Sequence, residues 1–169
     1  MVGDDQNQQV TILNIMIKLF NVGFTQKTAQ QFFQILKANK IDCLVDIRLN
    51  PNGQLSRFAF GQDLPYFLDK LVDGCQYFHR IDLAPSKDLL KAVRDKDNPM
   101  SKDYRLFEKA FYSQIERHSF IGNFTKQFGK FSNVVLLCSE PTTEKCHRRL
   151  ISQILLEKFP KDIEFGGDL

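Results

Sequence analysis

The chain has 169 residues, of which 43% are apolar and 25% charged, enough for one domain with a buried core and too few for two. Its net charge of +3, without an obvious basic stripe, permits an anionic partner and argues against a dedicated nucleic-acid-binding surface. The N-terminus is too polar for a signal peptide, and no apolar run approaches the roughly 20 residues that would cross a bilayer, so a cytoplasmic protein with reduced thiols is expected.

The N-terminal part of the chain is predicted to begin with an extension, followed by a strand and a helix. Residues 1–14 are largely polar and are expected to be disordered, and residues 15–169 are expected to form a single α/β domain. A first strand is expected within Ile12–Val22, which is dense in β-branched and apolar residues. Thr25 is expected to cap a helix that runs to about Asn39, because apolar residues recur there every three or four positions.

Strands and helices continue to alternate along the rest of the chain. Ile41–Ile47 and Asn133–Cys138 are apolar runs that predict buried strands, Cys75–Ile81 predicts another, and Asp162–Phe165 a short last one. Helices are expected over residues 63–73, 103–119, 121–131 and 142–158, with a polar helix or loop over residues 83–99. The alternation predicts a three-layer α/β fold, in which a mostly parallel sheet of about four to five strands has helices on both faces.

Polar side chains occur where the predicted strands end. In chain order these residues are Gly23, Asp46, Arg48, His79 and Cys138. Because the carboxyl ends of parallel strands meet at one edge of a sheet, we expect these residues to share a crevice of the kind that binds ligands in α/β proteins. Each also has a simpler interpretation. Asp46 and Arg48 could form a structural ion pair, and His79 could be a partly buried hydrogen-bonding residue.

The stretch from Val134 to Leu150 contains the highest concentration of potentially reactive side chains in the chain. Its apolar strand is followed, within eleven residues, by two thiols, a carboxylate, an imidazole and a guanidinium, those of Cys138, Glu140, Cys146, His147 and Arg148. Pro141–Glu144 has the residue types of a first helical turn, so these groups are expected where a parallel strand is followed by a helix. Free N–H groups at that helix start, together with arginines, would make an anion site.

The two cysteines of this stretch have several interpretations. A thiol beside a helix N-terminus and an arginine is biased toward the nucleophilic thiolate, which applies to Cys138 and Cys146. A Cys146–His147 dyad is not expected, because neighbours on a helix point about 100° apart. Cys138, Cys146, His147 and His79 could be zinc ligands, but their spacing matches no common zinc module and no metal is assigned. A Cys138–Cys146 disulfide is disfavoured in a reducing compartment, and the other two cysteines are expected to be small core side chains.

Four segments resemble one known family. They are LFNVGFT (residues 19–25), CLVDIRLNP (43–51), YFHRIDLAPSKDLL (77–90) and LLCSEPTTEKCHRRL (136–150), and they resemble domain-of-unknown-function family 488, whose members are bacterial and archaeal. The resemblance covers about residues 18–158 and implies an α/β fold and a polar site. It places the family's motif positions on Gly23, Asp46, Arg48, Pro51, His79, Cys138, Glu140, Cys146, His147 and Arg148. The chain departs from the family at Phe24, where a tyrosine is common.

These patterns favour an enzyme that acts on a phosphate-bearing or otherwise anionic substrate, nucleotides and nucleic acid included. Glu140 is the first candidate for the general acid/base and His79 the second, Asp46 is a further catalytic candidate, and Cys138 or Cys146 would be the nucleophile in a covalent reaction. The candidate anion-binding residues are Arg48, Arg57, Arg148, His147 and Gly23. The alternatives are a non-catalytic nucleotide or nucleic-acid binding module and, third, a metal protein. No cofactor, membrane partner or oligomeric state is assigned.

Overall fold

The computed structural model of the chain describes residues 16–53 and 56–169, so the predicted extension over residues 1–14 lies outside the described residues. Strands and helices alternate for most of its length. In chain order the strands and α-helices are β1 (Ile17–Gly23), α1 (Ala29–Ala38), β2 (Cys43–Asp46), α2 (Leu64–Leu71), β3 (Gln76–His79), α3 (Lys87–Arg94), α4 (Pro99–Lys102), α5 (Tyr104–Glu116), α6 (Phe124–Phe128), β4 (Asn133–Cys138), α7 (His147–Lys158) and β5 (Ile163–Asp168).

The described residues form one five-stranded sheet in the order β3-β2-β4-β1-β5, and every neighbouring pair is parallel. The register places Gly23 of β1 opposite Cys138 of β4, and Asp46 of β2 opposite His79 of β3. The predicted α/β fold with a parallel sheet is therefore confirmed, and the last strand is longer than the predicted segment over residues 162–165.

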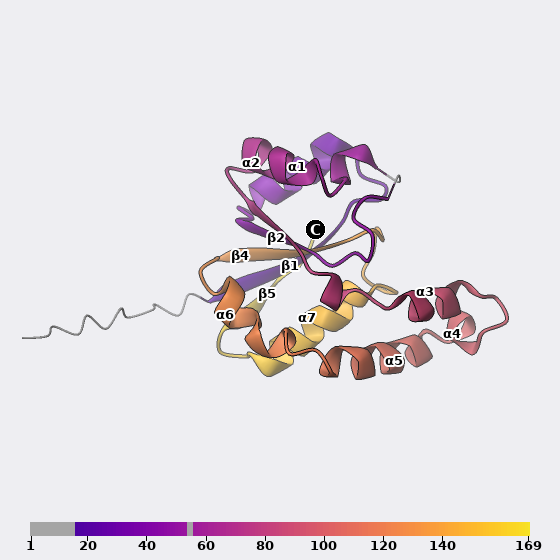
Figure 1. Cartoon of the computed structure of the whole chain (residues 1–169). Coiled ribbons are helices and arrows are strands. Elements are labelled where there is room, and N and C mark those ends of the chain that lie inside the picture. The colour runs from indigo at the N-terminus through magenta and orange to yellow at the C-terminus, as the bar shows by residue number, and fades with distance from the viewer. Residues whose placement is uncertain (1–15, 54–55) are drawn as a thin grey trace, which may run out of the picture.

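Helices cover both faces of the sheet, which gives the predicted three layers (Figure 1). Helices α1 and α2 lie over one face, and α5, α6 and α7 lie over the other. The side chains of β4 alternate between the two cores, as a pleated strand requires, with Val135 and Leu137 toward α1 and α2 and with Val134 and Leu136 toward α5 to α7. Such a strand is buried on both faces, which explains why its sequence is an apolar run.

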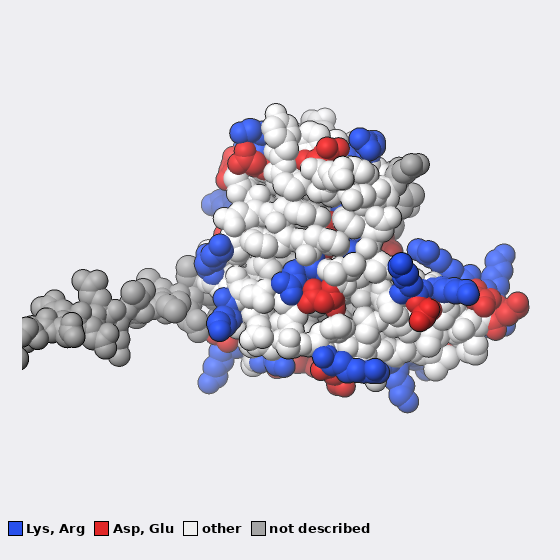
Figure 2. Space-filling model, viewed as in Figure 1, with Lys and Arg blue, Asp and Glu red and all other residues white. Residues whose placement is uncertain are grey.

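Phenylalanine fills much of both cores. On the α6 side, the rings of Phe120, Phe124, Phe128 and Phe131 contact one another, and Phe78 of β3 packs edge-on against Phe128 with 5.3 Å between ring centroids. Helices α3 and α4 extend away from the sheet alongside α5 (Figure 1). Lys and Arg are interspersed with Asp and Glu on the face shown in Figure 2, which has no continuous basic stripe.

Two predicted helix starts are wrong. Helix α1 is capped by Thr28 rather than Thr25, and it has a capping box in which Thr28 and Gln31 each bond the other's backbone N–H. Helix α7 begins at His147 rather than near residue 142, and Cys146, with an extended backbone, is its N-cap residue. Residues 141–145 form bends and turns instead. No helix in residues 16–53 and 56–169 is long and apolar enough to span a membrane.

Candidate functional site

The carboxyl ends of the parallel strands bring several predicted residues to one edge of the sheet. Cys138 is the last residue of β4 and lies opposite Gly23, the last residue of β1. On the other side of β4, Asp46 is the last residue of β2 and pairs in register with Leu137. The prediction that these strand ends share an edge is confirmed, because the sheet is parallel throughout its described strands.

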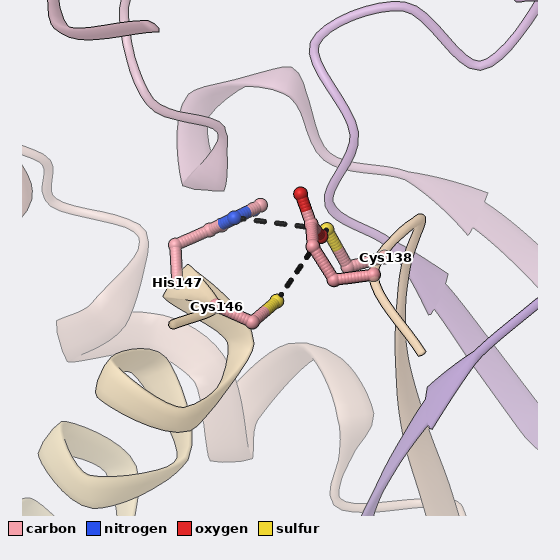
Figure 3. Close-up of side chains that lie close together, drawn as sticks. Cys138, Cys146 and His147 are labelled. Carbon is pink, nitrogen blue, oxygen red and sulfur yellow. Dashed lines mark hydrogen bonds between the residues drawn. The ribbon is translucent and has the colours of Figure 1, made fainter. Parts of the chain in front are cut away.

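Four side chains converge at this edge, and we call them the thiol cluster: Cys138, Glu140, Cys146 and His147. Their potential ligand atoms all lie within 4.8 Å of one another. The Cys138 Sγ lies 2.6 Å and the Cys146 Sγ 3.3 Å from the same Glu140 oxygen, Oε2, and the Cys138 Sγ lies 3.7 Å from His147 Nδ1. Figure 3 shows the two thiols and the imidazole pointing toward one another from the end of β4 and the start of α7.

Three of the four residues of the thiol cluster are buried. Cys138 is 3% exposed, Cys146 1% and His147 7%. Glu140 is an exposed residue, although its Oε2 atom faces the two thiols. A ligand from solvent would therefore reach the thiol cluster past Glu140.

Cys146 and His147 meet although they are neighbours in sequence, which corrects the expectation that their side chains diverge. That expectation assumed that both residues lie within a helix. Cys146 instead precedes α7 with an extended backbone, φ −128° and ψ 136°, so the helical angle between neighbours does not apply to it.

His147 is held in one tautomer by the backbone. Its Nε2 atom lies 3.0 Å from the carbonyl oxygen of Ile47, which can only accept a hydrogen bond, so Nε2 carries the proton. In the neutral ring the Nδ1 lone pair then faces the Cys138 thiol. The edge contact with Phe111, at 5.7 Å between ring centroids, fixes the ring further.

Burial and hydrogen bonding shift the pKa values of two members of the thiol cluster in opposite directions. Burial by itself raises the pKa of the Glu140 carboxyl, but hydrogen bonds from the Cys138 thiol, from the Glu140 backbone and from the Cys146 thiol, together with the nearby His147, hold the pKa below its usual value. The hydrogen bond with Cys138, followed by burial, raises the pKa of the Cys146 thiol. Glu140 is thus an anion at neutral pH, and the thiol of Cys146 is protonated, contrary to the expected bias toward thiolate.

Arg148 anchors the segment that carries Glu140. Its Nη1 donates to the Glu140 carbonyl oxygen at 2.7 Å, and the side chain is 1% exposed. Gly23 makes this approach possible, because a Cβ at that position would overlap the same carbonyl oxygen and would come within 3.0 Å of the Arg148 guanidinium. The Arg148 Nε is buried and has no hydrogen-bond partner among the residues that the structure describes.

A second polar group surrounds Asp46. Arg48 binds its carboxylate through Nε at 2.8 Å and through Nη2 at 2.5 Å, and that Nη2 also donates to the Ala59 carbonyl at 2.8 Å. Tyr77 donates its hydroxyl to Asp46 at 2.8 Å, and His79 Nε2 lies 2.8 Å from the Arg48 carbonyl. The simple ion-pair interpretation of Asp46 and Arg48 therefore describes their geometry.

The side chains of the predicted anion-binding arginines contact other groups of the protein. Arg48 and Arg148 are buried against Asp46 and the Glu140 backbone, so anion binding by their side chains stays a prediction. Arg57 lies on the surface, over the Phe60 ring and 3.7 Å from Asp63, and the structure does not place it with the thiol cluster. His79 is exposed at the end of β3, which β2 separates from β4, and its ring contacts the Arg48 carbonyl.

Lys27 and Tyr77 belong to this region and were not predicted from the sequence. Lys27, in the loop after β1, has its pKa lowered by partial burial and then by the nearby Arg148 charge. It lines an open cavity of about 680 Å³ together with Thr25, Gln31, Pro141 and Thr142. Tyr77 lies two residues before His79, so strand alternation places both side chains on one face of β3, a signal that could have linked Tyr77 to Asp46.

A comparison with protein-family models assigns the chain to a family. No curated protein and no solved structure matches it significantly. A family model, that of the domain of unknown function DUF488, matches residues 28–155, which is most of the chain. The match contains every residue of the thiol cluster and the Asp46–Arg48 pair, while β1 with Gly23 lies before it. The chain therefore belongs to the DUF488 family.

Proposed function

We propose that this DUF488 protein is an enzyme that acts on a phosphate-bearing or otherwise anionic substrate, and that the thiol cluster is its reactive centre. One observation carries the proposal. Three buried reactive groups and the carboxylate of an exposed residue converge within 4.8 Å at the carboxyl edge of a parallel sheet, the usual ligand-binding edge of this fold class.

Glu140 is the proposed general base. It is ionised at neutral pH because its pKa is lowered, and it can accept a proton from water or from a substrate hydroxyl on its exposed side. Arg148 and Gly23 act as positioning residues, because they hold the Glu140 backbone against β1. Cys138, whose thiol already donates to Glu140, would be the nucleophile if the reaction passes through a covalent intermediate.

The start of helix α7 beside the thiol cluster supports an anionic substrate. Helix α7 points its N-terminus at the cluster, and its N-cap residue, Cys146, makes no side-chain capping bond, so the first N–H groups of the helix are not capped by that side chain. The cavity lined by Lys27 also includes Pro141, the residue after Glu140, and its lysine would attract an anionic group.

The proposal is tested with a panel of phosphate monoesters, phosphate diesters and nucleotides. Glu140→Gln should lower the turnover of any accepted substrate by about 10²- to 10⁴-fold, the usual contribution of a general base. Glu144→Gln, an exposed glutamate four residues away, is the matched control and should keep the wild-type rate. Full activity in Glu140→Gln would disprove the assignment of the base. Salt-dependent binding of the panel without turnover would indicate a binding module instead.

A further inference from the structure

We propose that the thiol cluster binds one divalent metal ion, Zn²⁺ by its donor chemistry. The inference rests on the proposed function in that it supplies a cofactor for the same reactive centre. The four donor atoms are two sulfurs, one imidazole nitrogen and one carboxylate oxygen, all within 4.8 Å of one another. Thiolate and imidazole together favour Zn²⁺ over the oxygen-seeking Mg²⁺ and Ca²⁺.

The distances within the thiol cluster approach those of a tetrahedral zinc site. Metal–sulfur bonds of about 2.3 Å and metal–nitrogen or metal–oxygen bonds of about 2.0 Å put neighbouring ligand atoms about 3.5 Å apart. The Cys138 Sγ lies 3.7 Å from His147 Nδ1, and the Cys146 Sγ lies 3.3 Å from Glu140 Oε2. The Cys138 Sγ–Glu140 Oε2 distance of 2.6 Å is shorter than the separation of two ligands of one Zn²⁺ ion, and it would lengthen when the ion replaces the thiol proton.

The small number of protons in the thiol cluster favours the binding of a cation. Four atoms with lone pairs converge here, and the two thiols have at most two protons to share among them. Binding of Zn²⁺ releases both thiol protons to solvent, so the two thiolates neutralise the charge of the ion and the imidazole and carboxylate complete its coordination. Four electron-rich atoms lie close together here with few protons between them. The ion would stabilise this arrangement.

His147 already has the second-shell contact of a metal ligand. Its Nε2–H donates to the Ile47 carbonyl at 3.0 Å, which leaves the Nδ1 lone pair directed at the Cys138 thiol. Metal-binding histidines commonly donate their other N–H to a backbone carbonyl or a carboxylate, which fixes the tautomer and the ring orientation. A histidine that served only as a core hydrogen-bonding residue would not need Nδ1 to face two cysteines.

The open side of the thiol cluster distinguishes Glu140 from the other three ligands. Cys138, Cys146 and His147 are buried, whereas Glu140 is exposed. Catalytic zinc sites keep three protein ligands and one exchangeable position, while structural sites are closed. Glu140 is therefore the ligand that a water molecule or a substrate oxygen would replace, after which its carboxylate is free to act as a base.

The experiment is a metal titration of the full chain after treatment with a chelator, with Zn²⁺ measured by elemental analysis and Co²⁺ followed by visible absorption. We expect one ion per chain, with Co²⁺ showing the thiolate charge-transfer and tetrahedral bands. Cys146→Ala should lose these bands. Cys75→Ala, which removes a buried cysteine from the other core, should keep them. Glu140→Gln should keep the thiolate band, because the three buried ligands remain.

A second measurement uses the wild-type protein alone and does not depend on the folding of a variant. Zn²⁺ should protect Cys138 and Cys146 from alkylation, mapped by mass spectrometry, and should leave the labelling of Cys43 and Cys75 unchanged. The absence of cobalt bands together with the absence of protection would overturn the metal site. Turnover that persists in chelator, but is lost in Glu140→Gln, would overturn the metal site and keep the proposed function. One bound ion without turnover of any anionic substrate would support the metal site and overturn the enzyme.

Discussion

Gly23 is the residue on which the geometry of the candidate site depends most directly. A Cβ at this position would overlap the Glu140 carbonyl, which is backbone and cannot rotate away. We expect Gly23→Ala to lower the free energy of unfolding by about 1–3 kcal/mol, the usual cost of overpacking, and to displace Glu140 from the thiols. Gly122→Ala is the control, because a Cβ added at Gly122 would meet only the flexible Lys158 side chain, whose Nζ lies 3.8 Å from it. Urea unfolding compares both variants, and an unchanged Gly23→Ala protein would contradict the predicted overlap.

Tyr77 gives the protein a pH dependence at alkaline pH. Burial, followed by the Asp46 charge, raises the pKa of its hydroxyl, which donates to Asp46 at 2.8 Å. A folded-state pKa above the unfolded value of about 10 means that this stabilisation is complete below pH 10 and is lost as pH rises further. Tyr77→Phe should therefore be less stable than wild type by about 1–2 kcal/mol at pH 8, with a smaller difference at pH 11.

The control for Tyr77 is the exposed Tyr66, whose replacement by Phe should have little effect at either pH. Urea unfolding at pH 8 and pH 11 gives the two differences. A difference between Tyr77→Phe and wild type that stays constant with pH would show that the hydroxyl of Tyr77 does not ionise with a shifted pKa.

At the scale of the secondary-structure element, the start of α1 depends on its capping box. Thr28 accepts a hydrogen bond from the Gln31 N–H at 3.2 Å, and the Gln31 side chain accepts one from the Thr28 N–H at 2.8 Å. Thr28→Ala should lower the free energy of unfolding by about 1 kcal/mol. Thr142→Ala, at an exposed bend, should stay within about 0.5 kcal/mol of wild type in the same urea titration. Equal losses in both variants would argue against the cap.

The sequence predicted those elements whose signal is local. The apolar runs of β2 and β4, and the spaced apolar residues of α5 and α7, are visible in the sequence because burial acts on each residue separately. Thr25 was predicted as the cap, although Thr28, unlike Thr25, has a glutamine three residues later, which is the signature of a capping box. The sequence thus carried enough information to correct that boundary.

The start of α7 could not be predicted in the same way. Pro141 and Glu144 are typical of a first helical turn, but the Glu140 carbonyl is bound by Arg148 and the segment after it forms turns up to Cys146. That tertiary contact, made across Gly23, decides the local conformation and leaves no trace in the composition of residues 141–145. The convergence of Cys146 and His147 was missed for the same reason.

At the scale of the whole molecule, the parallel sheet was predictable and its strand order was not. Alternating strands and helices indicate parallel strands, so a shared polar edge follows for Asp46, His79 and Cys138. Which of them touch depends on strand order, because β2 lies between β3 and β4 and keeps His79 away from the thiols. Hydrogen bonds between strands far apart in sequence are not recorded in any local pattern. The edge of the sheet that carries the site could therefore be predicted, but not which of its residues contact one another.

The strand order also has a consequence for folding while the chain is being synthesised on the ribosome. Within the described residues, β1 pairs with β4 and β5, which are the last two strands to be synthesised. The first strand therefore stays unpaired until more than 100 further residues have emerged, while β2 and β3 can already pair with each other. Such a late, long-range closure is slow and leaves an apolar strand open to contact with other chains until the last strands arrive.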